Sequence, residues 1–379
     1  ALYQPSAPGL MRRAATNRSF AESGMNTLLL LPALFSSDGG IERILRLYVR
    51  AAGELSREHE RVLTVILNDS IIPAQRLSPY ATPALAPPVA CHRSRLACIW
   101  HTIRLARRSE RLICGHMNLL RLAHLARRFS SRLEVWLIAH GIEVWRTFNE
   151  GERRALRSTK RILCVSDYTR KQLQANCPGL DPSRLIVQPN ALDPQFTVAT
   201  SPASTAEPGL ILSVSRLTAA DAYKGIDHLI EALPAIRAKV PVARLRIVGD
   251  GDDRVRLEAL ATARHVTGAV EFMGRVSDEA LREHLASCEV FALPSGGEGF
   301  GLVYLEALAH GKPCIAADAG GAPEVVDAAS GALVPYGDVP ALEQACIDAL
   351  GTLWDPMKLR SRAAEFSYDV FRRRLAAGW

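Results

Sequence analysis

Two glutamates, Glu298 and Glu306, are separated by seven residues in the stretch "EGFGLVYLE". Glu298 lies in a Gly-rich turn, whereas Glu306 lies in an apolar run that a folded chain would bury. An uncompensated buried polar group costs about 2–7 kcal/mol, and a charge costs more. Glu306 therefore needs a partner. Its two oxygens suit a vicinal diol such as a ribose, and Glu298 suits a sugar hydroxyl. The alternative is an internal ion pair between Glu306 and an arginine.

The turn that carries Glu298 is expected to lead from a buried strand into a helix that opens near Gly301. Free N–H groups and the positive end of the helix dipole make such a start a phosphate site. Glycines allow backbone to approach a ligand closely. The turn with Gly299 and Gly301 and the helix start that follows are therefore a candidate phosphate site.

Two cations are predicted beside the same ligand, because Arg216 ends a strand and Lys224 lies in the following loop. Arg216 can bind a diphosphate as a fork and Lys224 as a point charge; a surface ion pair is the alternative. Gly39 and Gly40, in "SSDGGIER", would bring the first domain's backbone to that diphosphate. His140 ends the strand of "LIAHGIEVW", again at a carboxyl end.

Asp250 and Asp252, in "VGDGDD", imitate an Asp-x-Asp metal motif. They follow a strand and open a helix, so turn and N-cap chemistry explains them. No metal and no other cofactor is expected. The same stretch lacks the third glycine of a dinucleotide fingerprint, which argues against a dehydrogenase.

Short apolar runs alternate with helical patterns along the whole chain, which predicts parallel sheets with crossover helices. The fold class is α/β, with two Rossmann-like, doubly wound domains facing a central cleft, where ligands bind beyond the carboxyl ends of the strands. The expected divisions are a polar leader (1–24), an acceptor domain (25–195), a linker (196–208), a nucleotide-sugar domain (209–360) and a C-terminal helix that could cross back (361–379). Residues 69–98 contain five prolines and are interpreted as a long loop facing the cleft or a membrane.

Charge is distributed unevenly between the halves of this 379-residue chain. Residues 1–195 hold 28 Lys and Arg against 15 Asp and Glu, whereas residues 196–379 hold 18 against 24. The first half could meet nucleic acid, an anionic membrane or a pyrophosphate-bearing acceptor; a solvated arginine-rich surface is the alternative. The eight cysteines show no zinc or redox spacing, so reduced thiols are expected. Basic residues before "TLLLLPALF" mimic a signal peptide, but a first strand is favoured.

Taken together, the motifs resemble retaining glycosyltransferases of family 4, which have the GT-B fold and an E-x7-E motif. The resemblance covers Met25 to about Phe371 and is carried by "DGGIER", "HGIE", "CVSDYTRKQL", "QPNALD", "SVSRL", "YKGID", "LRIVGDGDDR", "EFMGRVSDEAL", "EGFGLVYLE" and "AGGAPEVV". It implies a nucleotide-sugar donor in the second domain and an acceptor mainly on the first. It implies these contacts: Glu298 with the donor sugar, Glu306 with the ribose, Arg216 and Lys224 with the diphosphate, and His140 near the reacting sugar. It also implies that the backbone of Phe300, Gly301 and Leu302 meets sugar and phosphate, and that Met273–Val276, with Gly274, Arg275 and Val276, lies by the base.

The expected activity is metal-independent transfer of a hexose from GDP-mannose or a UDP-sugar to a glycan or polyprenyl-diphosphate-linked acceptor in bacterial surface polysaccharide synthesis. Stabilising the charge that grows on the β-phosphate would drive the reaction. The resemblance implies retention, for which a same-face displacement is plausible. The protein would be cytoplasmic and peripheral on the inner face of an anionic membrane. A nucleotide-sugar epimerase of the same fold and a basic nucleic-acid-binding protein are the alternatives; no nucleic acid partner is expected.

Overall fold

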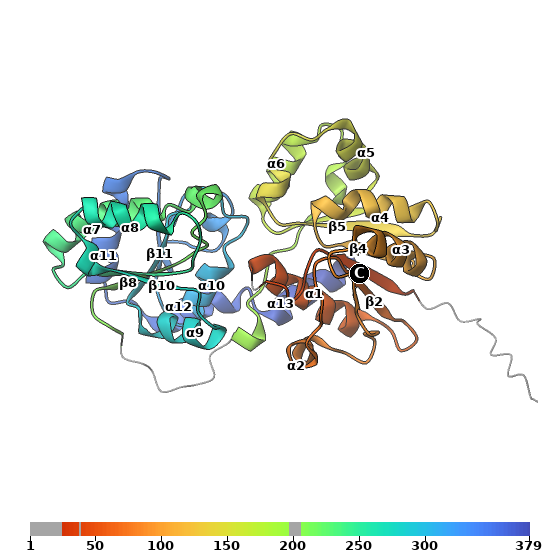
Figure 1. Ribbon diagram of the computed structural model, residues 1–379, viewed down its shortest axis with the longest axis horizontal. Helices are drawn as coiled ribbons and strands as arrows, with labels where there is room; N and C mark the ends of the chain where they lie inside the picture. Colours follow the sequence, from red (N-terminus) through yellow and green to blue (C-terminus); the bar gives the residue numbers. More distant parts are fainter. Residues whose placement is uncertain (1–24, 38, 197–205) are drawn as a thin grey trace, which may run out of the picture.

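The computed structural model describes residues 25–37, 39–196 and 206–379, which form two α/β domains side by side (Figure 1). The predicted leader (1–24) and most of the predicted linker lie outside the described residues. Each domain holds one sheet, and the neighbouring strands of both sheets pair in parallel. This is the two-domain, doubly wound arrangement that the alternation of apolar runs predicted.

The first sheet has seven strands in the order β3-β2-β1-β4-β5-β6-β7. Its strands are β1 (Thr27–Leu31), β2 (Val62–Ile66), β3 (Val89–Ala90), β4 (Arg111–Cys114), β5 (Glu134–Ala139), β6 (Arg161–Cys164) and β7 (Leu185–Val187). Leu28 and Leu30 of β1 pack into one core cluster, and Leu29 and Leu31 pack into another on the opposite face. Burial on both faces explains why "TLLLL" is apolar throughout rather than alternating.

The second sheet has six strands in the order β10-β9-β8-β11-β12-β13. Its strands are β8 (Leu210–Val214), β9 (Arg244–Val248), β10 (Val270–Gly274), β11 (Val290–Leu293), β12 (Cys314–Ala317) and β13 (Gly331–Val334). One core cluster unites this sheet with its helices. Strands β11 and β13 end directly before Pro294 and Pro335, because proline has no N–H to donate to a sheet ladder.

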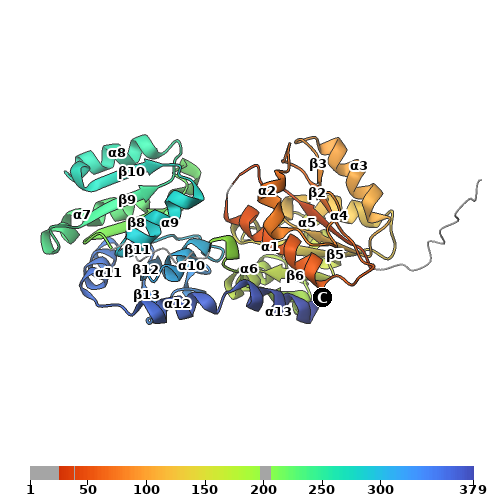
Figure 2. The same ribbon diagram turned by 90° about the horizontal axis from the view of Figure 1, so that it is seen from below.

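Helices cover both faces of each sheet (Figures 1 and 2). In the first domain they are α1 (Gly40–Leu55), α2 (Ala74–Leu77), α3 (Arg95–Ala106), α4 (Leu120–Arg127), α5 (Glu150–Ser158) and α6 (Asp167–Asn176). In the second they are α7 (Ile226–Lys239), α8 (Arg254–Ala263), α9 (Asp278–Ser287), α10 (Leu302–Ala309), α11 (Val339–Gly351) and α12 (Pro356–Ala364). Buried residues of α1 join one face of the first sheet, and those of α3 and α4 join the other.

The proline-rich segment 69–98 is not one long loop, which corrects the interpretation from sequence. It contains α2, a short 3₁₀ turn at Ser78–Tyr80, the edge strand β3 and the start of α3. Proline is tolerated at a sheet edge and in turns, where its missing N–H is not needed. Strand β3 is short and lies at the edge of the sheet, where Val89 and Ala90 pair with β2 alone.

The last helix, α13 (Tyr368–Gly378), leaves the second domain and packs on the first (Figure 2). The Tyr368 hydroxyl donates to Glu54 of α1 at 2.9 Å, and the Phe371 carbonyl accepts from the Gln188 amide. The Phe371 ring lies edge-on against Tyr48, 4.9 Å between centroids. The chain thus crosses between the domains twice, which limits how far they can separate.

Candidate active site

The two domains touch at the carboxyl ends of their strands. A Cβ on Gly299 would lie 1.9 Å from the carbonyl oxygen of His140, and one on Gly141 would lie 2.7 Å from the Gly299 Cα. Gly141 has φ +142°, which side chains rarely adopt. Both positions must therefore be glycine for the "HGIE" turn of the first domain to lie against the "GGEGFG" turn of the second.

Glu298 and Lys224 form an ion pair in this contact region. The Lys224 ammonium bonds to Oε1 of Glu298, and both side chains are largely shielded from water. A Cβ on Gly297, next to Glu298, would lie 2.9 Å from the Tyr223 ring. The structure thus brings two predicted site residues together. The sequence named a sugar hydroxyl as the partner of Glu298, and the structure adds Lys224 as an internal partner.

Glu306 is buried on α10, with 7% of its surface exposed, and its partner comes from the other domain. Nη1 of Arg43, on α1, donates to Oε1 of Glu306 at 2.7 Å, and Nη2 donates to Oδ1 of Asp278 at 2.5 Å. The Arg43 guanidinium also stacks over the Phe196 ring. Burial raises the pKa of Glu306 to about 6, and Arg43 opposes that rise. Sequence alone left a ribose and an arginine open as partners; the structure supplies the arginine.

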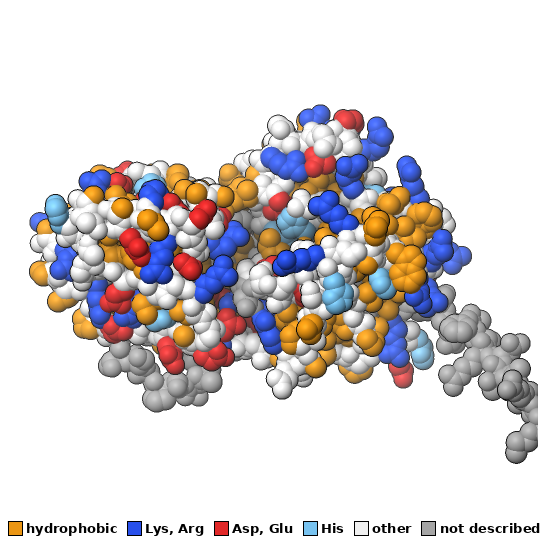
Figure 3. All heavy atoms as spheres, in the orientation of Figure 1, with side chains coloured by type: hydrophobic (Ala, Val, Ile, Leu, Met, Phe, Trp, Pro, Cys, Tyr) orange, Lys and Arg blue, Asp and Glu red, His pale blue; other side chains and the backbone are white. Residues whose placement is uncertain are grey.

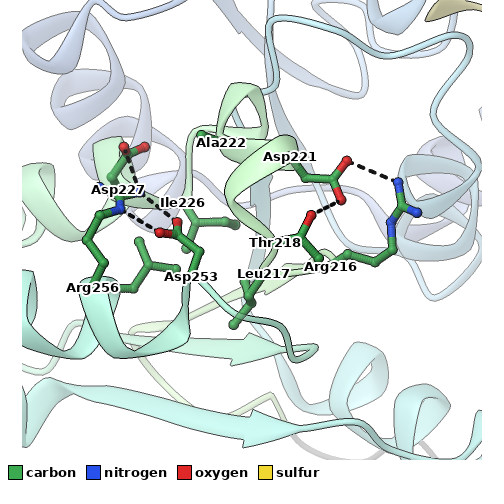
Figure 4. A pocket seen from close by; sticks show the side chains of 10 residues that line it. Arg216, Leu217, Thr218, Asp221, Ala222, Ile226, Asp227, Asp253 and Arg256 are labelled. Carbon is green, nitrogen blue, oxygen red and sulfur yellow. Dashed lines mark hydrogen bonds and ion pairs between the residues drawn. The ribbon is translucent and has the colours of Figure 1, made fainter. Parts of the chain in front are cut away.

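Arg216 lies farther out, with 73% of its side chain exposed. It donates to Oδ1 of Asp221 at 3.0 Å, while the Thr218 hydroxyl donates to Oδ2 at 2.7 Å. Figure 4 shows this group on one side of a small open pocket, with Arg256 and Asp253 on the other. Arg216 bonds to Asp221, and Lys224 bonds to Glu298. The Tyr223 hydroxyl, next to Lys224 in the chain, donates to the same Asp221 oxygen as Arg216, at 3.0 Å.

The predicted helix start is where the sequence placed it. Helix α10 begins at Leu302, and its N-cap Gly301 is left-handed, with φ +95°. A Cβ at Gly301 would lie 2.3 Å from the Tyr304 ring. The first domain faces this start, because a Cβ on Gly40 would lie 3.5 Å from a Leu302 methyl group. Gly39 is the N-cap of α1, so two helix starts converge on one region.

The residues predicted beside the base lie at the end of β10 and in the loop that leads to α9. Gly274 is left-handed, with φ +69°, and its carbonyl accepts from the Gly249 N–H at 2.8 Å. Val276 packs on the second-domain core, whereas Arg275 is exposed. Asp278, which pairs with Arg43, starts the helix that follows. The start of α9 therefore lies close to Glu306, because Asp278 and Glu306 both bind Arg43.

His140 lies at the end of β5 and is 9% exposed. Its ring Nε2 lies 2.8 Å from the Gly115 carbonyl, and its backbone N–H donates to Glu143 at 2.5 Å. The ring of His116, at the end of β4, lies 6.1 Å away and nearly parallel to it.

A second cross-domain contact involves Glu324, on the loop after β12. Its two carboxylate oxygens accept the backbone N–H groups of Asp167 and Tyr168 at 2.9 Å each. These are the first two residues of α6 in the other domain. A carboxylate at a helix N-terminus is stabilised by free N–H groups and by the dipole.

The aspartates of "VGDGDD" have structural partners in the turn before α8. Asp252 accepts the Ala219 N–H at 2.9 Å, and Asp253 accepts two bonds from Arg256. In the described part of the chain, no group of three His, Cys, Asp or Glu residues is arranged to hold a metal ion. The eight cysteines are all free and buried.

Reasoning from sequence missed the partners of the predicted residues, namely Arg43, Asp221, Asp278 and Glu324, and it missed His116. Arg43 had a usable signal, since it follows the "GG" turn by three residues and so points from the first turn of the helix. The others carry no periodic signal and come together only through the tertiary fold.

Comparison with known proteins identifies the class. Residues 39–196 match the family described as "Glycosyltransferase Family 4", and residues 208–352 match "Glycosyl transferases group 1". A Corynebacterium glutamicum GDP-mannose-dependent monoacylated alpha-(1-6)-phosphatidylinositol monomannoside mannosyltransferase is 39% identical over 167 residues, 40% of this chain and 42% of that protein. A Mycolicibacterium smegmatis GDP-mannose-dependent alpha-(1-6)-phosphatidylinositol monomannoside mannosyltransferase is 34% identical over 254 residues, 60% and 64% of the two chains. The matches thus span about half the length of these relatives.

Solved structures with the same fold cover nearly the whole chain. Anabaena Alr3699/HepE in complex with UDP is 21% identical, with a TM-score of 0.75 over 93% of this chain and 99% of that one. WaaG, a glycosyltransferase involved in lipopolysaccharide biosynthesis, is 18% identical, with a TM-score of 0.67 over 92% and 98%. The fold is GT-B, and the chain belongs to glycosyltransferase family 4.

Proposed function

We propose that the protein transfers a mannose from GDP-mannose, with retention of anomeric configuration, to a hydroxyl of a membrane-bound acceptor. The observation that carries the proposal is the convergence of Lys224, Glu298 and the α10 start with Glu306, where two domains meet. GDP-mannose is favoured over a UDP-sugar because the two relatives described above are GDP-mannose-dependent. A role in surface glycan or glycolipid synthesis follows from such an acceptor.

The chemistry requires stabilising the charge that develops on the β-phosphate as the nucleotide leaves. In our proposal Lys224 turns from Glu298 to the diphosphate, Arg216 swings in from its exposed position, and the free N–H groups of α10 face the same anion. Glu298 then accepts a hydrogen bond from a hydroxyl group of the donor sugar. The acceptor attacks from the face that the nucleotide leaves, and the departing phosphate takes the acceptor proton.

These cations and N–H groups match the charge of the diphosphate without a divalent ion, so we propose that no metal is needed. Turnover should persist in EDTA. Loss of turnover in EDTA that Mg²⁺ or Mn²⁺ restores would contradict this part of the proposal.

We further propose that the first domain docks on an anionic membrane through a surface formed by α3 and α4, here called the α3–α4 surface. Leu96 and Trp100 on α3 are 80% and 55% exposed, and Leu125 and Phe129 at the end of α4 are 37% and 46% exposed. Around them are exposed arginines: Arg93, Arg95, Arg104, Arg107, Arg108, Arg121, Arg127 and Arg128.

Charge complementarity favours a membrane as the occupant, since the described helices α3 and α4 contain no Asp or Glu. Figure 3 shows hydrophobic and basic side chains interspersed on the first domain, over the position of these helices in Figure 1. Arg153 and Arg154, on the adjacent α5, extend the basic region. Among the described residues no helix combines the length and the apolarity that a bilayer crossing needs. Docking would therefore be peripheral.

Thermal stabilisation by a panel of GDP, GDP-mannose, UDP and UDP-glucose tests the donor. Binding raises stability as RT ln(1 + [L]/Kd), so the true donor and its nucleotide should shift the Tm most. Release of GDP from GDP-mannose should depend on an acceptor. Release without any acceptor would favour an epimerase, and stabilisation by none of the four would contradict the proposed function.

A further inference from the structure

Arg43 of the first domain covers a carboxylate on the donor side of the second domain. Its Nη1 lies 2.7 Å from Oε1 of Glu306, and its Nη2 lies 2.5 Å from Oδ1 of Asp278. The side chains of Arg43 and Glu306 are only 13% and 9% exposed. A ribose diol needs both oxygens of a carboxylate within reach, so it cannot engage Glu306 fully while the guanidinium stays in place.

The charge of Arg43 depends on acids from the other domain. Arg43 lies at the start of α1, where its N–H donates to the Gly39 carbonyl at 3.1 Å. This start is the positive end of the helix dipole, which disfavours a cation. Burial in turn raises the pKa of Glu306, and Arg43 opposes that rise. The guanidinium and the carboxylate therefore compensate each other until another group replaces one of them.

The structure offers the Arg43 side chain a second position. A small open cavity lies beside it, and Asp193, Asp278 and Tyr80 are part of the cavity wall. Asp193 is buried, and its Oδ2 accepts the Tyr80 hydroxyl. Asp278 already bonds to Arg43. A rotation toward the cavity would keep Asp278, approach Asp193 and release Glu306, so the charge of Arg43 would stay compensated.

We propose that Arg43 is an internal competitor for the ribose of the donor nucleotide. It occupies Glu306 while no nucleotide is bound, and it turns toward Asp278 and Asp193 when the ribose hydroxyls take the carboxylate. The inference rests on the proposed function, in which the donor is a nucleotide sugar. It assigns Arg43 as a residue that sets donor affinity.

The competition acts on the product as well as on the donor. GDP and GDP-mannose carry the same ribose, so a site that bound this ribose at full strength would also retain the product. The return of Arg43 to Glu306 shortens the time for which GDP stays bound, and product release limits the turnover of many enzymes. Arg43 therefore lowers donor affinity and speeds product release.

Nucleotides with and without the ribose hydroxyls test the competition. Arg43→Met removes the hydrogen-bond donors, so GDP should bind about ten- to a hundredfold more tightly. The affinity for 2′,3′-dideoxy-GDP, which lacks the diol, should stay the same. Isothermal titration at pH 9 keeps Glu306 ionised in this variant, where Arg43 no longer opposes the rise of its pKa.

The matched control is Arg57→Met, at an exposed arginine just after α1, which should leave both affinities unchanged. An arginine that simply attracted the diphosphate would give the opposite sign, because its loss would weaken both nucleotides. Weaker or unchanged binding of GDP to Arg43→Met, or an equal gain for GDP and dideoxy-GDP, would overturn the proposal.

A second variant, Asp278→Asn, changes a side chain that is 43% exposed and leaves Arg43 in place. Without the charge of Asp278, Arg43 should bind Glu306 more firmly. The ratio of GDP affinity to dideoxy-GDP affinity should therefore fall about three- to tenfold. A ratio that stays constant or rises would overturn the proposal.

The ribose is common to GDP and UDP, which separates this inference from the proposed function. If UDP binds instead of GDP, the proposed donor is wrong, and UDP with 2′,3′-dideoxy-UDP decides the role of Arg43 in the same way. If GDP binds but Arg43→Met leaves the dependence on the diol unchanged, the inference alone is wrong. If neither the wild type nor Arg43→Met binds any of these nucleotides, both are wrong.

Discussion

Glu306 is a buried carboxylate whose bond partner belongs to the opposite domain. Had Arg43 come from the same domain, the pair would be a fixed part of one core. Because it comes from α1, the pair exists only while the domains are closed. A donor ribose at Glu306 would compete with Arg43, which keeps Asp278 as a second partner. We therefore propose that the same carboxylate serves closure and donor binding in turn.

Glu306→Gln should weaken nucleotide binding more than it weakens the fold. The amide keeps the shape but replaces one acceptor by a donor. Losing a bond to a charged group costs roughly 1.5–3 kcal/mol, which is about ten- to a hundredfold in Kd. Without ligand at pH 8, the Tm should not fall, since Arg43 keeps Asp278 and a burial penalty disappears. Isothermal titration with GDP and the Tm of the same variant decide this. A large fall in Tm with an unchanged Kd would show a purely structural ion pair.

The raised pKa of Glu306 predicts a pH dependence of stability. The group titrates near 4.5 in the unfolded chain and near 6 in the folded protein, so the folded state binds the proton more tightly. The contribution of Glu306 to the free energy of unfolding is therefore complete below pH 4.5. As the pH rises through 6, about 2 kcal/mol of that contribution is lost. The stability of the wild type relative to Glu306→Gln should fall over this range. Denaturant unfolding from pH 4.5 to 7.5 measures it. Glu283→Gln, an exposed control, should show no such trend. A stability difference between the wild type and Glu306→Gln that stays constant over this pH range would contradict the prediction.

Lys224 and Arg216 are expected to act on the leaving diphosphate. Lys224→Ala and Arg216→Ala should each lower kcat by roughly ten- to a thousandfold while the protein stays folded. Lys239→Ala, an exposed lysine at the end of α7, is the control and should retain full turnover. Steady-state rates with circular dichroism of each variant provide the measurement. Full activity in both variants would remove these cations from the site.

At the scale of elements, loops rather than helices or strands bring the two domains together. The glycine turns at Gly141 and Gly299 allow backbone contact, and Glu324 caps α6 from across the boundary. Each contact lies at the carboxyl end of a strand, where a doubly wound sheet gathers its loops. Sheet topology therefore determines which loops can meet.

Glu324→Gln should loosen the first turn of α6 without unfolding either domain. The carboxylate accepts two backbone N–H groups, and losing charge-assisted bonds costs roughly 1.5–3 kcal/mol. Hydrogen exchange at the Asp167 and Tyr168 amides should speed up about ten- to a hundredfold. Backbone amides of β1 should exchange in Glu324→Gln as they do in the wild type. The control Glu283→Gln should alter exchange neither at the start of α6 nor in β1. Unaltered exchange at α6 would mean that the cap does not hold the domains closed.

At the scale of the whole molecule, the two domains differ in charge, and the basic half carries the α3–α4 surface. Trp100→Ala and Phe129→Ala should each reduce binding to anionic vesicles about ten- to a hundredfold, since burying such a side chain is worth about 1.5–3 kcal/mol. Arg107→Ser should cost about 1 kcal/mol, or fivefold, and its effect should shrink with salt. Co-sedimentation with phosphatidylglycerol vesicles measures each.

The controls for that surface lie on the second domain. Leu353 and Met357 are 100% and 69% exposed, so Leu353→Ala and Met357→Ala should leave vesicle binding unchanged. Equal partition of the wild type to neutral and anionic vesicles, or none to either, would contradict docking through this surface.

The sequence by itself determined the two-domain α/β fold and the position of the glycine-rich turn before α10. Strands such as "TLLLL" are apolar throughout because both faces are buried, and the glycines before Leu302 mark a helix start by their backbone freedom. These are local signals. Tertiary structure alone decided that Glu306 bonds to Arg43, 263 positions away, that Glu298 bonds to Lys224, and that His116 lies beside His140. Such pairs depend on how two sheets face each other, and a single sequence has no periodicity that records that geometry.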